Sequence, residues 1–232
     1  MAWNNGIEEG TPAHSLAASD ANTIRAVAGP GSGKSFAIKR RILRLLESGV
    51  NPEKILAITF TRTAAHDRKT EISSLGIDGA DQVHSRTLHS HALRILMHDS
   101  VLEQTGRVPR MVIDHEQKPI FRDIDNPDFG NVRDKEKLLD AYMAGWARLQ
   151  QDEAGFEQSQ IDRDFKTDLL DWFNRHNGIL VGGVIPIVIE YLRNNPAVEF
   201  IGEDDHIIVD EVQDLNKSEQ VVINIIRGDL NI

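Results

Sequence analysis

A glycine-rich turn between an apolar segment and a helical segment most constrains how this chain can fold. Glycine has no Cβ and accepts positive φ, so backbone built from it can wrap closely around an anion. The backbone N–H groups then point inward, and the dipole of the following helix adds its positive end there. The pattern predicts a phosphate-binding P-loop. Its residues are Ala28 (where the general pattern has glycine), Gly29, Pro30, Gly31, Ser32, Gly33, Lys34 and Ser35.

Two side chains at the end of this turn have defined chemistry in a nucleotide site. Lys34 would reach the β- and γ-phosphates of ATP, and the Ser35 hydroxyl would ligate Mg²⁺. We therefore expect ATP and Mg²⁺ as cofactors.

An acidic segment near the other end of the chain complements this turn. The apolar run His206–Val209 predicts a short strand that ends in Asp210 and Glu211. Asp210 would hold Mg²⁺, and Glu211 would polarise the water that attacks the γ-phosphate. Gln213 can orient that water, because its amide both donates and accepts hydrogen bonds. The two segments together predict a nucleoside triphosphatase.

Hydrophobic periodicity predicts an α/β fold with a parallel sheet. The expected strands are Thr23–Ala28, Ile55–Phe60, Gln82–Arg86, His206–Val209 and the beginning of one at Leu230–Ile232. Helices are expected after Thr11, from the P-loop to about Glu47, and over Ala64–Leu75, Ala92–Leu96, Glu136–Gln151, Gln160–His176, Pro186–Asn194 and Lys217–Ile226. Residues 1–100 and 197–232 would form the ATP-binding domain. Residues 101–196 would form a mainly helical insertion, in which we identify no convincing series of parallel strands.

Composition narrows the class of protein. The 232 residues include no cysteine, which excludes disulfides and cysteine-based zinc sites. No secretory signal or membrane-spanning run is evident, so we expect a cytoplasmic protein without a membrane partner. The net charge of −10 argues against coating of duplex DNA, although a local basic groove remains compatible with it.

Four motifs resemble those of the UvrD/Rep-like superfamily 1 DNA helicases. They are AGPGSGKS, ITFTRTAA, TLHSHALRIL and IIVDEVQD, in that order along the chain. They are similar to motifs I, Ia, Ib and II of that family. The Asp-Glu-x-Gln-Asp form of the last is the most discriminating, because many P-loop enzymes have only Asp-Glu.

The resemblance implies a RecA-like domain 1A interrupted by domain 1B, with ATP hydrolysis driving 3′ to 5′ movement along single-stranded DNA. It places Phe60, Thr61 and His89 at DNA-binding positions, and Arg62 beside them at the end of a strand. His14 falls about where the family places an adenine-binding glutamine. One imidazole makes only one such bond at a time, which leaves adenine selectivity open.

Whole helicases of this kind continue into a second RecA-like domain. We therefore expect a fragment with very weak ATPase activity, whose partners are that domain and single-stranded DNA or a single-strand–duplex junction. Two other functions remain open. One is a non-motor nucleotide switch whose insertion, residues 101–196, docks a protein. The other is a helicase-like ATPase subunit of a nuclease or phage-defence complex.

Overall fold

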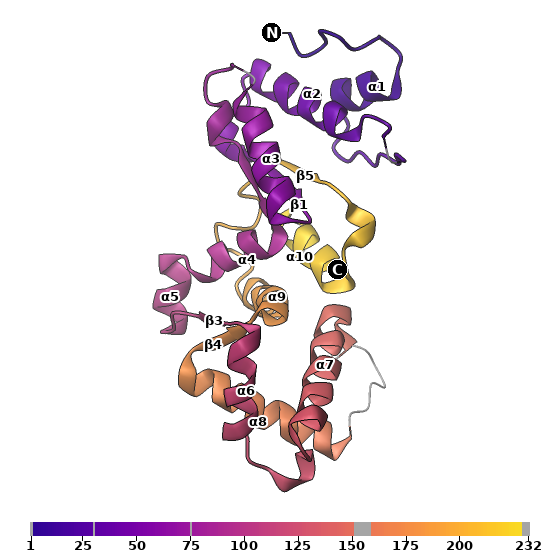
Figure 1. Ribbon diagram of the computed structural model, residues 1–232. Helices are drawn as coiled ribbons and strands as arrows, with labels where there is room; N and C mark the ends of the chain where they lie inside the picture. Colours follow the sequence, from indigo (N-terminus) through magenta and orange to yellow (C-terminus); the bar gives the residue numbers. More distant parts are fainter. Residues whose placement is uncertain (1, 30, 75, 151–158, 229–232) are drawn as a thin grey trace. The chain divides into compact units, whose positions relative to one another are not determined.

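The computed structural model describes residues 2–29, 31–74, 76–150 and 159–228. The chain divides into two compact units (Figure 1). The first comprises Met1–Thr87 and Glu203–Val212, and the second comprises Leu88–Gly202 and Gln213–Ile232. Both contain helices and parallel strands, which confirms the predicted α/β class. The predicted boundaries, at residues 100 and 196, separate a domain from its insertion and differ from the boundaries of these two units. They stay a prediction.

The first unit is built on a three-stranded parallel sheet in the order β2-β1-β5. Its strands are β1 (Ile55–Thr59), β2 (His84–Thr87) and β5 (His206–Val209). Every residue of β1 is buried, as expected of a central parallel strand with a continuous apolar sequence. Because β1 and β5 are parallel, both end at the same edge of the sheet, which places Asp210 there.

Helices and short 3₁₀ turns complete this unit. They are α1 (Pro12–Ala18), α2 (Lys34–Glu47), α3 (Arg62–Ser73), η1 (Pro52–Lys54) and η2 (Ala80–Gln82). The apolar side of α2 forms a core with β1, α3 and the segment before β2. Its buried members are Ile38, Ile42, Leu45, Leu46, Ile55, Ile72, Ala80 and Val83.

Two arginines of α2 hold α1 against it (Figure 1). Arg41 Nη1 donates to the carbonyl oxygens of Leu16 at 3.2 Å and Ser19 at 2.8 Å. Arg44 Nη1 donates to the same Ser19 oxygen at 3.1 Å. The carbonyls at the end of α1 lack partners within their own helix, so these bonds cap it.

The predicted strand Thr23–Ala28 is wrong. Residues 24–29 are irregular, and the side chain of Val27 is 91% exposed. A strand exists only through hydrogen bonds to a neighbour, and the described sheet pairs β5 with β1 alone. The segment therefore leads into the P-loop without joining the sheet. The strand expected at Leu230–Ile232 lies outside the described residues.

The second unit is mainly helical. Its helices are α4 (Leu88–Leu96), α5 (Asp99–Thr105), α6 (Asp114–Asp123), α7 (Val132–Arg148), α8 (Gln160–His176), α9 (Val184–Asn194) and α10 (Lys217–Ile226), with η3 (Pro127–Phe129) and η5 (Val181–Gly183). Its core is rich in aromatic residues: Val112, Ile120, Phe121, Ile124, Phe129, Leu139, Phe165, Leu169, Trp172, Phe173 and Leu180. The predicted helices of the insertion are confirmed within a few residues at each end.

Two short strands in this unit correct the expectation of an insertion without parallel pairing. β3 (Arg110–Val112) pairs in parallel with β4 (Gly178–Leu180). Three residues are too few to show an alternating pattern, so sequence periodicity could not reveal them. A Cβ at Gly178 would lie within 3.2 Å of Val112 and Trp172, so glycine permits the close approach of β4.

No helix within the described ranges is long and apolar enough to cross a membrane.

Candidate nucleotide-binding site

The first turn of α2 and the carboxyl end of β5 bring a lysine and two acids together. Lys34 Nζ lies 3.1 Å from Asp210 Oδ1 and also contacts Glu211 Oε1. Partial burial on its own lowers the pKa of Lys34. The hydrogen bonds and negative charges of Glu211 and Asp210 outweigh that effect and raise the pKa above its ordinary value. The lysine is therefore charged and bound by both acids.

Asp210 is held on both of its carboxylate oxygens. Oδ2 accepts a hydrogen bond from Arg68 Nη2 at 2.6 Å, and Oδ1 accepts one from the backbone N–H of Glu211 at 3.0 Å. The backbone N–H of Asp210 donates to the Ile58 carbonyl at 2.9 Å, which continues the ladder between β1 and β5. The sheet and α3 thus fix both the position and the orientation of this carboxylate.

Glu211 occupies a backbone conformation that favours glycine. Its φ is +55°. Left-handed geometry brings the Cβ of an L-residue close to the carbonyl oxygen and costs about 1–2 kcal/mol. The side chain is 39% exposed and contacts Lys34. Strain of this kind concentrates at functional sites.

At two positions the glycine-rich turn has the positive φ that the sequence predicts. Gly31 has φ +74° and Gly33 has φ +81°, whereas Gly29 lies outside the left-handed region. Gly33 caps α2 without a side-chain hydrogen bond. The first N–H groups of a helix lack intrahelical partners, so they are available to an anion. Pro30 lies outside the described residues.

The oxygen donors of this site fit Mg²⁺. Ser35 is exposed on the first turn of α2, and Asp210 presents Oδ1 toward Lys34 of the same turn. Mg²⁺ is usually held by one or two protein oxygens, with phosphate oxygens and water completing the shell. Among the described residues no three histidine, cysteine or acidic side chains cluster as a metal site. One oxygen from Ser35 and one from Asp210 would suit a metal that arrives with phosphate.

Arg68 is the member of this site that sequence analysis missed. It lies on α3 at the spacing of Ala65 and Ile72, which are buried on the apolar side of the helix. A charged residue on an apolar stripe indicates an internal ion pair, because burial of an unpaired charge is costly. That signal was present in the sequence.

The predicted base-contacting residue, His14, lies on α1. Its backbone N–H donates to Thr11 Oγ1 at 3.3 Å, which caps the helix. Its ring lies 5.4 Å from that of Trp3, and the guanidinium of Arg44 lies over Trp3 at 5.9 Å. The N-terminal arm thus places the aromatic ring of Trp3 beside His14, a contact that the sequence did not predict.

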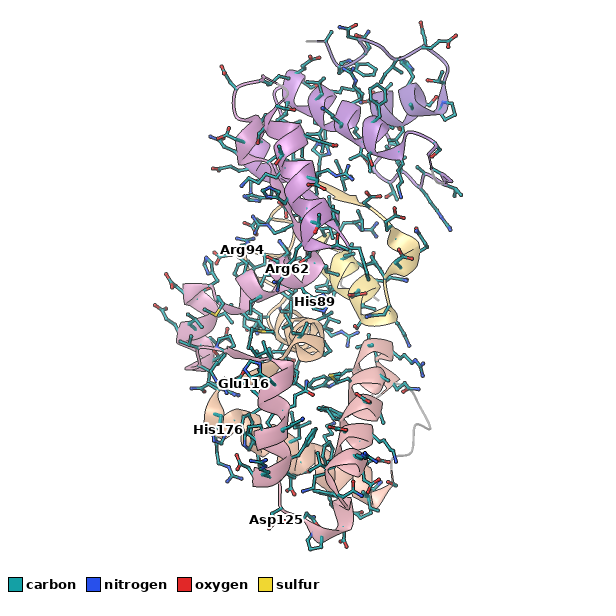
Figure 2. The ribbon with its side chains drawn as sticks, in the orientation of Figure 1. Arg62, His89, Arg94, Glu116, Asp125 and His176 are labelled. Carbon is teal, nitrogen blue, oxygen red and sulfur yellow. The ribbon has the colours of Figure 1, made fainter. Side chains whose placement is uncertain are left out.

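Three of the predicted DNA-binding residues follow β1. Phe60 is 55% exposed, which excludes the ordinary role of a strand-ending phenylalanine in the core. Thr61 caps α3 by accepting a hydrogen bond from the N–H of Ala64 at 3.1 Å. Arg62 is exposed at the first position of α3 (Figure 2).

The remaining predicted residues belong to the second unit. His89 lies on α4 (Figure 2), with its Nδ1 3.6 Å from Oε1 of Glu219 on α10. Burial lowers the pKa of His89, and the charge of Glu219 opposes that shift without overcoming it. Gln213 is exposed in the short turn η6 (Val212–Asp214).

Comparison with known proteins decides the family. The sequence model of the UvrD/REP helicase N-terminal domain matches residues 12–231. The chain belongs to the UvrD/REP helicase N-terminal domain family. The ATP-dependent DNA helicase PcrA of Staphylococcus aureus strain Mu50 is 27% identical over 212 residues, and that of Staphylococcus epidermidis is 26% identical over the same length.

Each alignment covers 86% of this chain and 29% of the PcrA protein. The chain therefore spans less than a third of the length of these relatives. Membership of the UvrD/REP family agrees with the resemblance drawn from the four motifs.

Proposed function

We propose that this chain is the ATP-binding part of an ATP-dependent superfamily 1 DNA helicase or translocase that moves 3′ to 5′ on single-stranded DNA. The observation that carries the proposal is the contact of Lys34 with Asp210 and Glu211. Two motifs far apart in the sequence meet there, and they would form complementary halves of one phosphate and metal site. The parallel sheet of the first unit and membership of the UvrD/REP family support the same interpretation.

Each side chain would contribute to one step of the reaction. Lys34 is bound by the two acids. Phosphate oxygens of ATP would draw it away, which releases Glu211 to accept a proton from the attacking water. Mg²⁺, held by Ser35 and Asp210, would neutralise charge on the phosphates. A second RecA-like domain would add an arginine, which is worth roughly 10³–10⁵ in rate.

Nucleotide binding is tested by titrating the chain with a fluorescent ATP analogue and Mg²⁺. K34A is expected to bind at least about tenfold more weakly, because one charge-assisted contact to phosphate is lost. K118A, which changes an exposed lysine of α6, is the control. Equal affinity for wild type and K34A would contradict the proposal.

Movement on DNA requires that the exposed ring of Phe60 meets a base. Stacking on an aromatic ring is worth roughly 1–3 kcal/mol per base, so F60A should weaken binding of single-stranded DNA about fivefold or more. Fluorescence anisotropy with a labelled oligonucleotide measures this. A chain that binds nucleotide but no DNA would instead be a non-motor switch.

A further inference from the structure

Arg68 supplies a second, buried cation to the acidic end of β5, and we infer that it is the resident counter-ion of Asp210. It positions that carboxylate, and it makes Mg²⁺ binding dependent on nucleotide. The role of Arg68 in Mg²⁺ binding rests on the proposed nucleotide site. Its test uses neither nucleotide nor catalysis.

The contacts of Arg68 fix it in place. The side chain is 6% exposed, and Nη2 donates to Asp210 Oδ2 at 2.6 Å. The helix that carries it is bound to the sheet, because Ser85 Oγ on β2 donates to the Ala65 carbonyl at 2.9 Å. Within the described residues Nη1 of Arg68 is buried without a hydrogen-bond partner. The guanidinium therefore has little freedom to leave Asp210.

The charges of the site balance without a metal. Lys34 and Arg68 face Asp210 and Glu211, which gives two cations and two anions. Asp210 divides its oxygens between the two cations, with Oδ1 toward Lys34 and Oδ2 toward Arg68. A dication entering this balanced site alone would meet no net negative charge to attract it.

Binding of nucleotide would change this balance of charge at only one of the two carboxylate oxygens of Asp210. Lys34 is 28% exposed on its side chain and is free to turn to a phosphate, whereas Arg68 is buried. Oδ1 then loses its lysine and keeps the hydrogen bond from the Glu211 N–H, while Oδ2 stays bound to Arg68. Asp210 thus offers one oxygen, in a fixed direction, to a metal that arrives with negatively charged phosphates.

The test measures thermal unfolding of the full 232-residue chain, without nucleotide, in EDTA and in increasing Mg²⁺. Arg68→Met leaves a buried carboxylate without its main partner, so melting in EDTA should fall by roughly 6 °C or more. Mg²⁺ should recover part of that loss, with a half-saturating concentration on the order of tenfold lower than any response of wild type. Arg68→Lys keeps the charge, so it should not acquire the Mg²⁺ response.

Lys69→Met is the matched control, because Lys69 is the exposed neighbour on the same helix. A Mg²⁺ response of R68M no greater than that of wild type or K69M overturns the inference. So does an R68K variant that responds to Mg²⁺ as R68M does.

A double variant keeps the inference testable if R68M does not fold. Asp210→Asn removes the charge that Arg68 balances, so R68M/D210N should melt higher than R68M in EDTA and should lose the Mg²⁺ response. A double variant as unstable as R68M would show that Arg68 acts through packing, which overturns the inference. Failure of K34A to lose nucleotide affinity, in contrast, would refute the proposed function and leave this result unaffected.

Discussion

Lys34 Nζ lies 3.1 Å from Asp210 Oδ1, although the two residues stand near opposite ends of the chain. The contact joins the first turn of α2 to the end of β5. The positive charge that we propose for phosphate binding is therefore held by two protein acids. Nucleotide would have to break these contacts, so the acids would oppose its binding.

Glu211→Gln should accordingly bind nucleotide more tightly than wild type. The amide retains the shape of the side chain but no longer holds Lys34 by charge or repels phosphate. We expect a gain of about two- to fivefold in affinity, which corresponds to the roughly 0.4–1 kcal/mol of a partly exposed ion pair. Equilibrium titration with a fluorescent ATP analogue measures it, and E71Q, an exposed glutamate of α3, is the control. Weaker binding by E211Q would contradict this role of Lys34.

The backbone of Glu211 gives a second prediction. At φ +55°, glycine avoids the clash that any L-residue with a Cβ suffers. Glu211→Gly should therefore be about 1 kcal/mol more stable than Glu211→Ala, although glycine ordinarily lowers stability relative to alanine. Both variants lack the carboxylate, so the difference isolates the backbone. Urea unfolding measures it, and an alanine variant as stable as the glycine variant would refute the strain.

The environment of His89 predicts a loss of stability in acid. Its pKa is lowered by burial, so the folded protein resists a proton that the unfolded chain accepts below about pH 6.5. Stability should fall as the pH drops from about 6.5 toward the folded pKa, by at most about 1.4 kcal/mol per pH unit for this group.

His89→Gln should remove that part of the pH dependence, measured as the free energy of unfolding between pH 7.5 and 5.5. H115Q, at an exposed position of α6, should leave it in place. If acid instead stabilised the wild type relative to H89Q, attraction of a protonated His89 to Glu219 would outweigh the cost of burial.

A buried lysine holds the end of α6 in the second unit. Lys135 is 7% exposed, and its Nζ donates to the carbonyl oxygens of Phe121 at 2.8 Å and Ile124 at 2.6 Å. Lys135→Met keeps most of the apolar stem but leaves both carbonyls without this donor, which should cost about 1–3 kcal/mol. Lys137→Met, at a side chain that is 79% exposed, should change stability by less than about 0.5 kcal/mol. Urea unfolding followed by tryptophan fluorescence compares the two.

The sequence predicts an element best where that element carries its own start and stop signals. Helix α10 begins and ends at Lys217 and Ile226 as predicted, because Asn216 and Glu219 form a capping box and Gly228 follows with positive φ. The central strand β1 was identified from its continuous apolar run, and it ends one residue before the predicted Phe60.

The errors arose where structure depends on a distant partner. Thr23–Ala28 has a strand-like sequence but no hydrogen-bonded neighbour among the described strands. β3 and β4 are too short for a pattern and form through pairing with each other. Arg68 was overlooked because its partner, Asp210, lies far along the chain.

The strand order β2-β1-β5 has a consequence for the behaviour of this chain in solution. Within the described residues, β2 and β5 each pair on one side only. Unpaired sheet edges are templates for strands of other molecules. The net charge of −10 opposes association at low ionic strength, and salt weakens that repulsion. Concentrated solutions of the chain should therefore self-associate more readily as salt is added, which is a practical guide to its purification.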